Sequence, residues 1–362
     1  MSKLYQRRIS MGRAVTVVPD KLAIIAGAGT GKSTLLRKQA LVAAHHKRVL
    51  YLTFTETNAF EFAQGIRREI GAIPENVTIM TWFSFLLAHG VRPFPLESIP
   101  ERIDACFMPQ GRTRPKRGVR KGDHDYFCNK VGSAYTSRLP ELTLACDEQW
   151  GGKVFDRISE AFPVIMIDEA QDFSGADYDV MEKLMIRSES MLVVGDPRQS
   201  TYRTGNEPLY KGKFTNLFDY LERRGVCPID HERLGVSYRC PEEIISLANK
   251  LYLGMYPEVR AANSCQNGQR VFYLNKGDVK DYADSKSCVA LTPTKRTTVP
   301  DGIPRINMGE SKGMTIPNVI VYPSGDMKKW LKGAEVEWKP GTLAKFYVAI
   351  TRASESVAFV MD

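Results

Sequence analysis

Short apolar runs alternate with helical patterns through the first two thirds of the chain. Residues 22–25 (LAII) precede a glycine-rich segment, and in residues 35–44 (LLRKQALVAA) apolar positions return at helical spacing. Two further runs, at residues 163–167 (PVIMI) and 191–194 (MLVV), have the length and composition of buried strands. This alternation, which continues to about residue 220, predicts a parallel sheet covered by helices on both faces.

The segment between the first strand and the first helix has the features of a phosphate-binding loop. It reads GAGTGKS at residues 27–33. Its glycines let the backbone turn its N–H groups inward, and the start of the following helix adds partial positive charge. A chance glycine-rich turn is the alternative, which the flanking strand and helix disfavour. The predicted ATP-binding residues of this loop are Gly27, Ala28, Gly29, Thr30, Gly31, Lys32, Ser33 and Thr34.

Charged and polar side chains at the ends of these strands predict a hydrolytic site. Lys32 is expected to reach the β- and γ-phosphates and Ser33 to hold Mg²⁺. Directly after the strand at 163–167, Asp168 is placed to share the Mg²⁺ and Glu169 to polarise the attacking water. An acidic helix start is the alternative, which becomes unfavourable downstream of a phosphate-binding loop. Gln199, after the strand at 191–194, is placed to sense the γ-phosphate, so ATP and Mg²⁺ are the expected cofactors.

Seven segments that follow the loop region in a fixed order resemble those of superfamily-one DNA helicases of the UvrD, Rep and PcrA type. They are LTFTETNAFEF (Leu52–Phe62), TIMTWFSF (Thr78–Phe85), IDEAQD, VVGDPRQSTYR, LGVSYRCPEEIISLAN (Leu234–Asn249), ESKGMTIPNVIV (Glu310–Val321) and FYVAITRASESVAFV (Phe346–Val360). The resemblance implies an α/β fold of two RecA-like P-loop domains, each a mostly parallel sheet flanked by helices. The expected domains are residues 1–232, with a short insertion at about 86–150, and residues 233–362.

The resemblance also implies catalytic roles for two arginines of the second domain. Arg239, in SYR, and Arg352, in AITRA, match residues that reach the γ-phosphate across a cleft and act as arginine fingers in cis. Their alternative is an ordinary surface position. ATP would close this cleft and hydrolysis would open it. The predicted catalytic set is Lys32, Asp168, Glu169, Gln199, Arg239 and Arg352.

Nucleic-acid contacts are implied by the same resemblance, with aromatic rings stacking on bases and hydroxyl groups binding phosphates. Core packing at helical spacing is the alternative for Trp82, Phe83 and Phe85; Phe85 is assigned to the core and Phe83 stays open between the two roles. The predicted contacts are Thr53, Phe54, Thr55, Asn58, Thr81, Trp82, Tyr202, Ser311 and Lys312.

Several positions depart from the family pattern. Thr204 and Gly205 stand where a tryptophan and an arginine are usual, so a second stacking platform is missing. Residues 311–316 (SKGMTI) are nearer the Pif1 and Dda-like branch, which leaves polarity open, with 3′ to 5′ movement favoured. Gln6 is the candidate for the adenine contact, although its spacing to the loop is several residues longer than usual. Selectivity for adenine therefore stays open.

Composition fits this interpretation. The net charge of +9 suits a polyanionic partner, and the seven cysteines include no CxxC pair, as expected in a reducing, cytoplasmic compartment. No apolar run approaches the roughly 18 residues that span a bilayer.

A basic stretch at residues 112–121 is expected to be an exposed loop, either contacting phosphates or solvated. Residues 292–309 form a brief connection where relatives branch into an accessory domain.

Together these features predict an ATP-dependent DNA helicase or single-strand DNA translocase. The alternative is a nucleotide-gated DNA- or protein-binding ATPase without processive unwinding. A small-molecule kinase is disfavoured because it leaves the DEAQD, SYR and AITRA segments without a role. The expected partner is single-stranded DNA or a tailed duplex, with other replication or repair proteins as further candidates, and the expected state is a monomer.

Overall fold

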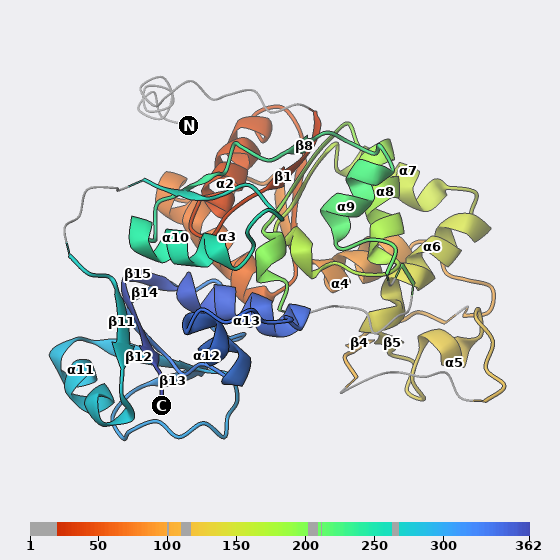
Figure 1. The fold of residues 1–362 in the computed structure, drawn as a ribbon. Helices are drawn as coiled ribbons and strands as arrows, with labels where there is room; N and C mark the ends of the chain where they lie inside the picture. Colours follow the sequence, from red (N-terminus) through yellow and green to blue (C-terminus); the bar gives the residue numbers. More distant parts are fainter. Residues whose placement is uncertain (1–19, 100, 110–116, 202–208, 211, 263–267) are drawn as a thin grey trace. The chain divides into compact units, whose positions relative to one another are not determined.

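The computed structural model divides into two compact units (Figure 1). The structure describes residues 20–99, 101–109, 117–201, 209–210, 212–262 and 268–362. Unit 1 takes its described residues from 1–24, 33–194 and 204–230. Unit 2 is built from 25–32, 195–203 and 231–362, so most of the predicted phosphate-binding loop and the segment after β7 pack with the C-terminal residues.

A six-stranded sheet forms the centre of unit 1, in the order β3-β2-β6-β7-β1-β8. Its strands are β1 (Lys21–Ile25), β2 (Val49–Thr53), β3 (Val77–Thr81), β6 (Val164–Ile167), β7 (Ser190–Gly195) and β8 (Ile229–Asp230). The pairs β2·β3, β2·β6, β6·β7 and β1·β8 are all parallel. The strands predicted from the apolar runs are therefore confirmed. Buried side chains on both faces explain why these runs are almost continuously apolar.

Helices cover both faces of this sheet. Right-handed crossovers that run in opposite directions along the strand order place their helices on opposite faces. Accordingly, α2 (Lys32–Ala43) and α3 (Glu56–Ile70) lie on one side of the strands, and α8 (Asp177–Arg187) and α9 (Leu217–Arg223) on the other (Figure 1). The predicted α/β layering is confirmed for this unit.

The predicted insertion lies between β3 and β6 and is mainly helical. Its two short strands, β4 and β5, pair in parallel. Of the basic stretch, residues 112–116 lie outside the described residues, while Arg117, Arg120 and Lys121 are exposed. The elements between β3 and β6 are α4 (Trp82–Phe85), η1 (Leu86–Val91), β4 (Cys106–Phe107), α5 (His124–Phe127), β5 (Ala134–Tyr135), η2 (Thr136–Arg138), α6 (Leu139–Gln149) and α7 (Lys153–Ala161).

Unit 2 is organised around a five-stranded sheet, in which each neighbouring pair is parallel. In sheet order its strands are β11 (Val271–Leu274), β15 (Ala353–Val360), β14 (Ile316–Val321), β12 (Cys288–Thr292) and β13 (Arg305–Asn307). The expected connection at 292–309 is thus more than a loop, because β13 within it extends the sheet beside β12. A second parallel pair joins β9 (Val236–Ser237) to β10 (Arg260–Ala261).

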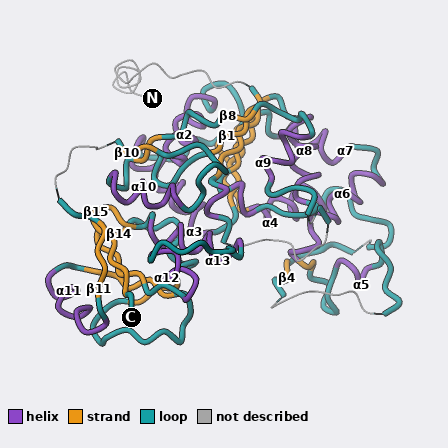
Figure 2. Tube along the Cα trace, in the orientation of Figure 1, coloured by secondary structure: helices purple, strands orange, loops and turns teal. Residues whose placement is uncertain are grey.

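Helices lie on both sides of this sheet, as the purple segments of Figure 2 show. They are α10 (Glu242–Lys250), α11 (Val279–Ser285), α12 (Gly325–Leu331) and α13 (Pro340–Ile350). Almost every residue from Leu343 to Ile350 is buried, so α13 is a central helix of the unit. Short 3-10 turns complete the chain: η3 (Ala170–Asp172), η4 (Pro197–Gln199) and η5 (Lys276–Asp278). Among the described residues, no helix combines the length and apolar character that a bilayer crossing requires.

Candidate functional site

The predicted phosphate-binding loop folds as a tight turn held by backbone hydrogen bonds within unit 2. Gly29 and Gly31 have φ values of 71° and 87°, in the left-handed region that favours glycine. The amide of Gly27 donates to the carbonyl of Leu234 at 3.1 Å, and the amide of Tyr238 donates to the carbonyl of Gly29 at 2.9 Å. The loop is therefore fixed by the segment that carries the SYR motif.

Arg239 lies directly beside this loop. A Cβ added to Gly29 would lie 2.5 Å from the Cβ of Arg239, so only glycine permits this approach. The Nη1 of Arg239 donates to the carbonyl of Thr351 at 3.3 Å. The structure thus brings Arg239 to the glycine loop and to the residue that precedes Arg352.

Arg352 is connected to the motif that follows β7. Its side chain is 1% exposed, and its Nη2 donates to the Oε1 of Gln199 at 3.2 Å. Further donor contacts reach the carbonyls of Val348, at 3.2 Å, and Met314, at 3.4 Å. The Nε2 of Gln199 in turn donates to the Oδ2 of Asp196 at 2.8 Å. Residues 153 positions apart in the sequence are therefore joined by one hydrogen bond.

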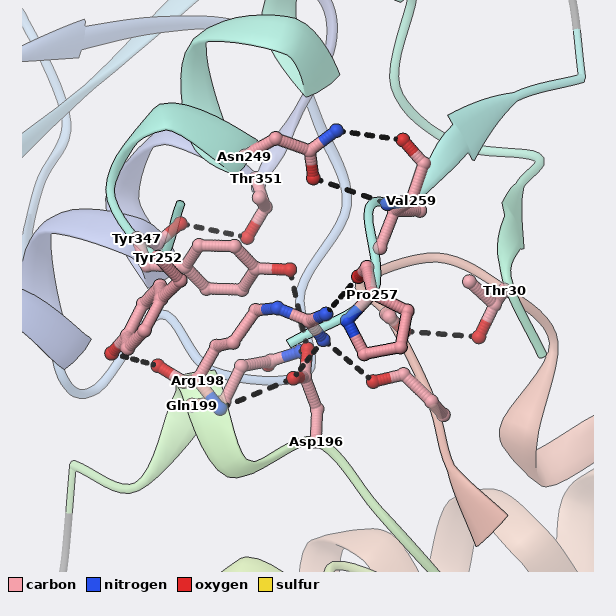
Figure 3. A network of polar contacts seen from close by, with 12 residues as sticks. Thr30, Asp196, Arg198, Gln199, Asn249, Tyr252, Pro257, Val259, Tyr347 and Thr351 are labelled. Carbon is pink, nitrogen blue, oxygen red and sulfur yellow. Dashed lines mark hydrogen bonds and ion pairs between the residues drawn. The ribbon is translucent and has the colours of Figure 1, made fainter. Parts of the chain in front are cut away.

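Asp196 is the centre of a buried polar network, drawn in Figure 3. Its Oδ1 accepts from the Nη1 of Arg198 at 3.1 Å, and its Oδ2 accepts from the hydroxyl of Tyr347 at 3.3 Å. Burial, with Asp196 adding to it, raises the pKa of Tyr347 well above its usual range, so the hydroxyl stays a donor. A buried charge with this many partners is held in one geometry.

A second polar group lies in unit 1, where Asp168 follows β6. Its carboxylate accepts from three donors: the Oγ of Ser33 at 3.2 Å, the hydroxyl of Tyr51 at 2.9 Å and the amide of Glu169 at 2.8 Å. Burial and then the charge of Asp168 raise the pKa of Tyr51 well above its usual range. The two residues predicted to share Mg²⁺ are therefore adjacent in the folded chain.

The Ser33 and Asp168 pair suits Mg²⁺ by its chemistry. Both side chains present oxygen, the donor that this cation requires, and Mg²⁺ is commonly held by one or two carboxylates with phosphate and water oxygens. Beside them, Glu169 has a φ of 57°, which is unusual for a residue other than glycine. Its carboxylate accepts from the side chain of Gln171, so Glu169 is held in a defined orientation. Lys32 begins α2 immediately before Ser33.

The predicted nucleic-acid contacts of unit 1 converge because β2 and β3 end together. Thr53 and Thr81 are register partners, so the residues after them lie side by side. Phe54 and Phe83 meet edge to face, with ring centroids 5.7 Å apart. The hydroxyl of Thr55 caps α3 by accepting from the amide of Asn58 at 3.1 Å.

Trp82 does not have the expected exposure. Its side chain is 0% exposed, its Nε1 donates to the Oδ1 of Asp177 at 2.7 Å, and its ring contacts Phe85 and Phe173. These contacts leave no ring face for a base, so Trp82 is a core residue, as the alternative interpretation held. Phe85 is buried as expected.

The remaining predicted contacts divide by exposure. Thr53, Thr81 and Ser311 are buried, and the Oγ of Ser311 donates to the carbonyl of Met308 at 2.7 Å. Lys312 is partly exposed. Four neighbouring residues of unit 1 remain accessible and are called the aromatic edge: Phe54, Thr55, Asn58 and Phe83. Gln6, Tyr202, Thr204 and Gly205 lie outside the described residues.

Comparison with known families and proteins places these features in context. A family model described as an AAA domain matches residues 12–205, more than half of the chain. The chain belongs to the AAA domain family. The resemblance to superfamily-one helicases of the UvrD and PcrA type is confirmed by the relatives of this AAA domain protein.

Two curated bacterial relatives illustrate the likeness. The protein is 21% identical over 311 residues to a probable DNA helicase II homolog of Mycoplasma genitalium, covering 70% of this chain and 42% of the relative. It is 25% identical over 240 residues to the ATP-dependent DNA helicase PcrA of Bacillus subtilis, covering 52% and 32%. A complex structure of Arterivirus nonstructural protein 10 (helicase) with DNA is similar at a TM-score of 0.47 and 12% identity, over 94% of this chain and 60% of that one. The chain spans less than half the length of these two curated relatives.

Several residues of this AAA domain protein were missed by sequence reasoning. Tyr238 is 68% exposed although its amide is bonded to the glycine loop, and its place in SYR beside Arg239 was the available signal. Arg198 and Tyr347 lie in the VVGDPRQSTYR and FYVAITRASESVAFV segments, but nothing in those segments indicates their contacts with Pro257 and Asp196, which are 59 and 151 residues away.

Proposed function

We propose that the chain is an ATP-hydrolysing DNA motor, a helicase or single-strand translocase in which residues 1–232 and 233–362 act as two RecA-like domains. Two contacts that join predicted catalytic residues support the proposal. Arg239 packs on Gly29, and Arg352 is bonded to Gln199. Arg239 also donates to the carbonyl of Thr351, the residue before Arg352, so the two segments that carry these arginines are in direct contact.

In the proposed reaction the loop binds the triphosphate and its neighbours stabilise charge. Backbone N–H groups of the loop and Lys32 bind the β- and γ-phosphates. Ser33 and Asp168 would hold Mg²⁺, which supplies neutralisation of phosphate charge. Glu169 orients and polarises the attacking water, while Arg239 and Arg352 stabilise the charge that develops in the transition state.

The exposed ring of Tyr238 is proposed as the stacking surface for the nucleotide base. Its backbone is anchored to Gly29, so the ring is held next to the loop while most of its surface stays open. Stacking on an aromatic face tolerates any base. Tyr238 alone would therefore not select adenine over other bases. Gln6 is kept as the proposed adenine contact.

Single-stranded DNA is proposed to lie on the aromatic edge. Stacking on a ring such as Phe54 or Phe83 is worth about 1–3 kcal/mol per base and needs no particular sequence. The hydroxyl of Thr55 and the amide of Asn58 are suited to phosphate oxygens. Tyr202 and Lys312 complete the proposed contacts. We further propose a cytoplasmic monomer, with replication or repair proteins as additional partners.

Strand displacement tests the motor proposal against the nucleotide-gated clamp. Purified protein is mixed with ATP, Mg²⁺ and duplexes carrying a 3′ or a 5′ single-stranded tail, and ATP hydrolysis is followed in parallel with and without single-stranded DNA. The motor proposal expects DNA-stimulated hydrolysis, with displacement of the 3′-tailed duplex. DNA binding that responds to ATP without DNA-stimulated hydrolysis would establish the clamp instead. Displacement of only the 5′-tailed duplex would keep the motor and reverse its polarity.

A further inference from the structure

A short segment of unit 2, Pro257–Val259, lies against the first glycine of the phosphate-binding loop, and we call it the strap. One amide side chain fixes its end. The Nδ2 of Asn249 donates to the carbonyl of Val259 at 2.8 Å, and the Oδ1 of Asn249 accepts from the amide of Val259 at 3.2 Å (Figure 3). Asn249 therefore satisfies both backbone polar groups of Val259.

The other end of the strap is held by Arg198, which is 3% exposed. Its Nη2 donates to the carbonyl of Pro257 at 2.5 Å, and its Nη1 donates to the carbonyl of Ala26 at 3.3 Å and to Asp196 at 3.1 Å. The guanidinium also lies over the ring of Tyr256, 5.0 Å from its centroid. One guanidinium thus connects the strap, the residue before the loop and the Asp196 network.

Val259 fills the space in which a side chain at Gly27 would lie. A Cβ added to Gly27 would be 2.4 Å from the Cγ2 and 2.9 Å from the Cγ1 of Val259, and 3.1 Å from the Cγ2 of Thr30. Gly27 is absent from the residues with positive φ, unlike Gly29 and Gly31. Glycine at position 27 is therefore required by the close approach of Val259 and not by the local backbone conformation.

We propose that the strap is a positioning element of the ATP site, in which Val259 and Arg198 hold the loop in its phosphate-binding shape. This inference rests on the proposed function, because it assumes that ATP binds to the loop. The strap contacts the loop through Gly27 and the carbonyl of Ala26. The strap limits the conformations that the loop can adopt before ATP binds. Less conformational entropy is therefore lost when the phosphates bind. Loosening the strap should therefore weaken nucleotide binding.

A compensating pair of substitutions tests this proposal. Gly27→Ala, Val259→Ala and the double variant are titrated with a fluorescent ATP analogue in the presence of Mg²⁺. Gly27→Ala introduces overpacking and should weaken binding by roughly tenfold or more. The double variant removes both clashing methyl groups and should bind more tightly than Gly27→Ala. Equal affinities of Gly27→Ala and the double variant would overturn the proposal, because Gly27 would then be needed for another reason.

A matched control separates positioning from general packing. Val279, on α11, is 1% exposed and belongs to a different cluster of buried residues, so Val279→Ala removes the same two methyl groups away from the loop. Val259→Ala should weaken nucleotide binding more than Val279→Ala, even where thermal unfolding midpoints fall equally. Equal nucleotide affinities of these two variants would also overturn the proposal. If Gly27→Ala does not fold, Val259→Ala and Val279→Ala still test it.

Substitution of Asn249 tests the strap through the side chain that holds Val259. Asn249→Ala leaves both backbone groups of Val259 without their side-chain partner, so it should also weaken nucleotide binding. Wild type and Lys32→Ala distinguish failure of the proposed ATP site from failure of the strap proposal. If wild type fails to bind the analogue, or Lys32→Ala binds it equally well, the ATP site itself is refuted. If these two behave as expected and the compensation fails, only the strap is refuted.

Discussion

The Asp196 network of unit 2 and the aromatic edge of unit 1 both follow the ends of parallel strands, yet they differ in exposure. Asp196, Gln199 and Arg352 are at most 3% exposed, and they are joined in series by hydrogen bonds. Phe54 and Phe83 stay partly exposed and contact each other only at a ring edge. The difference in exposure matches the two proposed tasks. Groups that stabilise developing charge act best when fixed and shielded from water, whereas rings that accept any base must remain accessible.

This contrast predicts that variants of the two regions separate kinetically. Substitutions in the buried network should mainly lower kcat for ATP hydrolysis, because they remove interactions made in the transition state. Substitutions at the aromatic edge should mainly weaken DNA binding.

Arg352→Ala should lower DNA-stimulated kcat by roughly 10³-fold, the size of effect expected for an arginine finger. Phosphate release at saturating ATP and DNA measures this, and DNA affinity is determined in parallel by fluorescence anisotropy. Arg352→Lys retains the charge but loses the planar set of donors, so it should recover little of the rate. An Arg352→Ala enzyme with normal kcat and weakened DNA binding would contradict the assignment of this arginine to catalysis.

Gln199→Ala should lower kcat by about 10²-fold, as removal of one preorganised hydrogen-bonding group does in other enzymes. The amide connects Asp196 to Arg352, so its loss leaves a buried guanidinium without one of its acceptors. The double variant with Arg352→Ala should be little worse than Arg352→Ala alone, since the two side chains act as a unit. Additive losses in kcat would show that Gln199 and Arg352 work independently.

Phe83→Ala should weaken binding of single-stranded DNA by roughly tenfold, because stacking on one ring is lost. Phe60, on α3, is a matched control, since it is 61% exposed but outside the aromatic edge. DNA affinity is measured for both variants at one fixed salt concentration. Equal losses for Phe60→Ala and Phe83→Ala would show that exposure alone, and not the aromatic edge, determines DNA binding.

Tyr238→Ala should raise the KM for ATP by about fivefold, near the lower end of the stacking range. Tyr238→Phe keeps the ring and should stay close to wild type, because the proposed role needs no hydroxyl. This exposed ring lies in unit 2. The variant therefore tests whether exposed rings bind substrate in unit 2 as they are proposed to do in unit 1. A fall in kcat at unchanged KM would instead place Tyr238 with the buried network.

Local patterns accounted for much of the fold. The strands at β1, β6 and β7, the helix after the glycine loop and the parallel arrangement were predictable, because apolar runs and helical spacing are properties of neighbouring residues. The same holds for the adjacency of Ser33 and Asp168, since carboxyl ends of parallel strands meet at one edge of a sheet. Burial was harder to predict. Trp82 has helical-core spacing and also a motif position, and its complete burial with a bond to Asp177, 95 residues away, decides between them.

The sequence by itself therefore predicted which residues would carry the proposed chemistry: the glycine loop, the two carboxylates after one strand, Gln199 after another and the two motif arginines. Tertiary structure decided which of them are buried, which are exposed and what holds them. Arg198 connects Ala26 to Pro257, and Val259 lies on Gly27, through contacts between segments that share no sequence pattern. The physical reason is that close packing and buried hydrogen bonds depend on the three-dimensional neighbours of a residue, which a local pattern does not record.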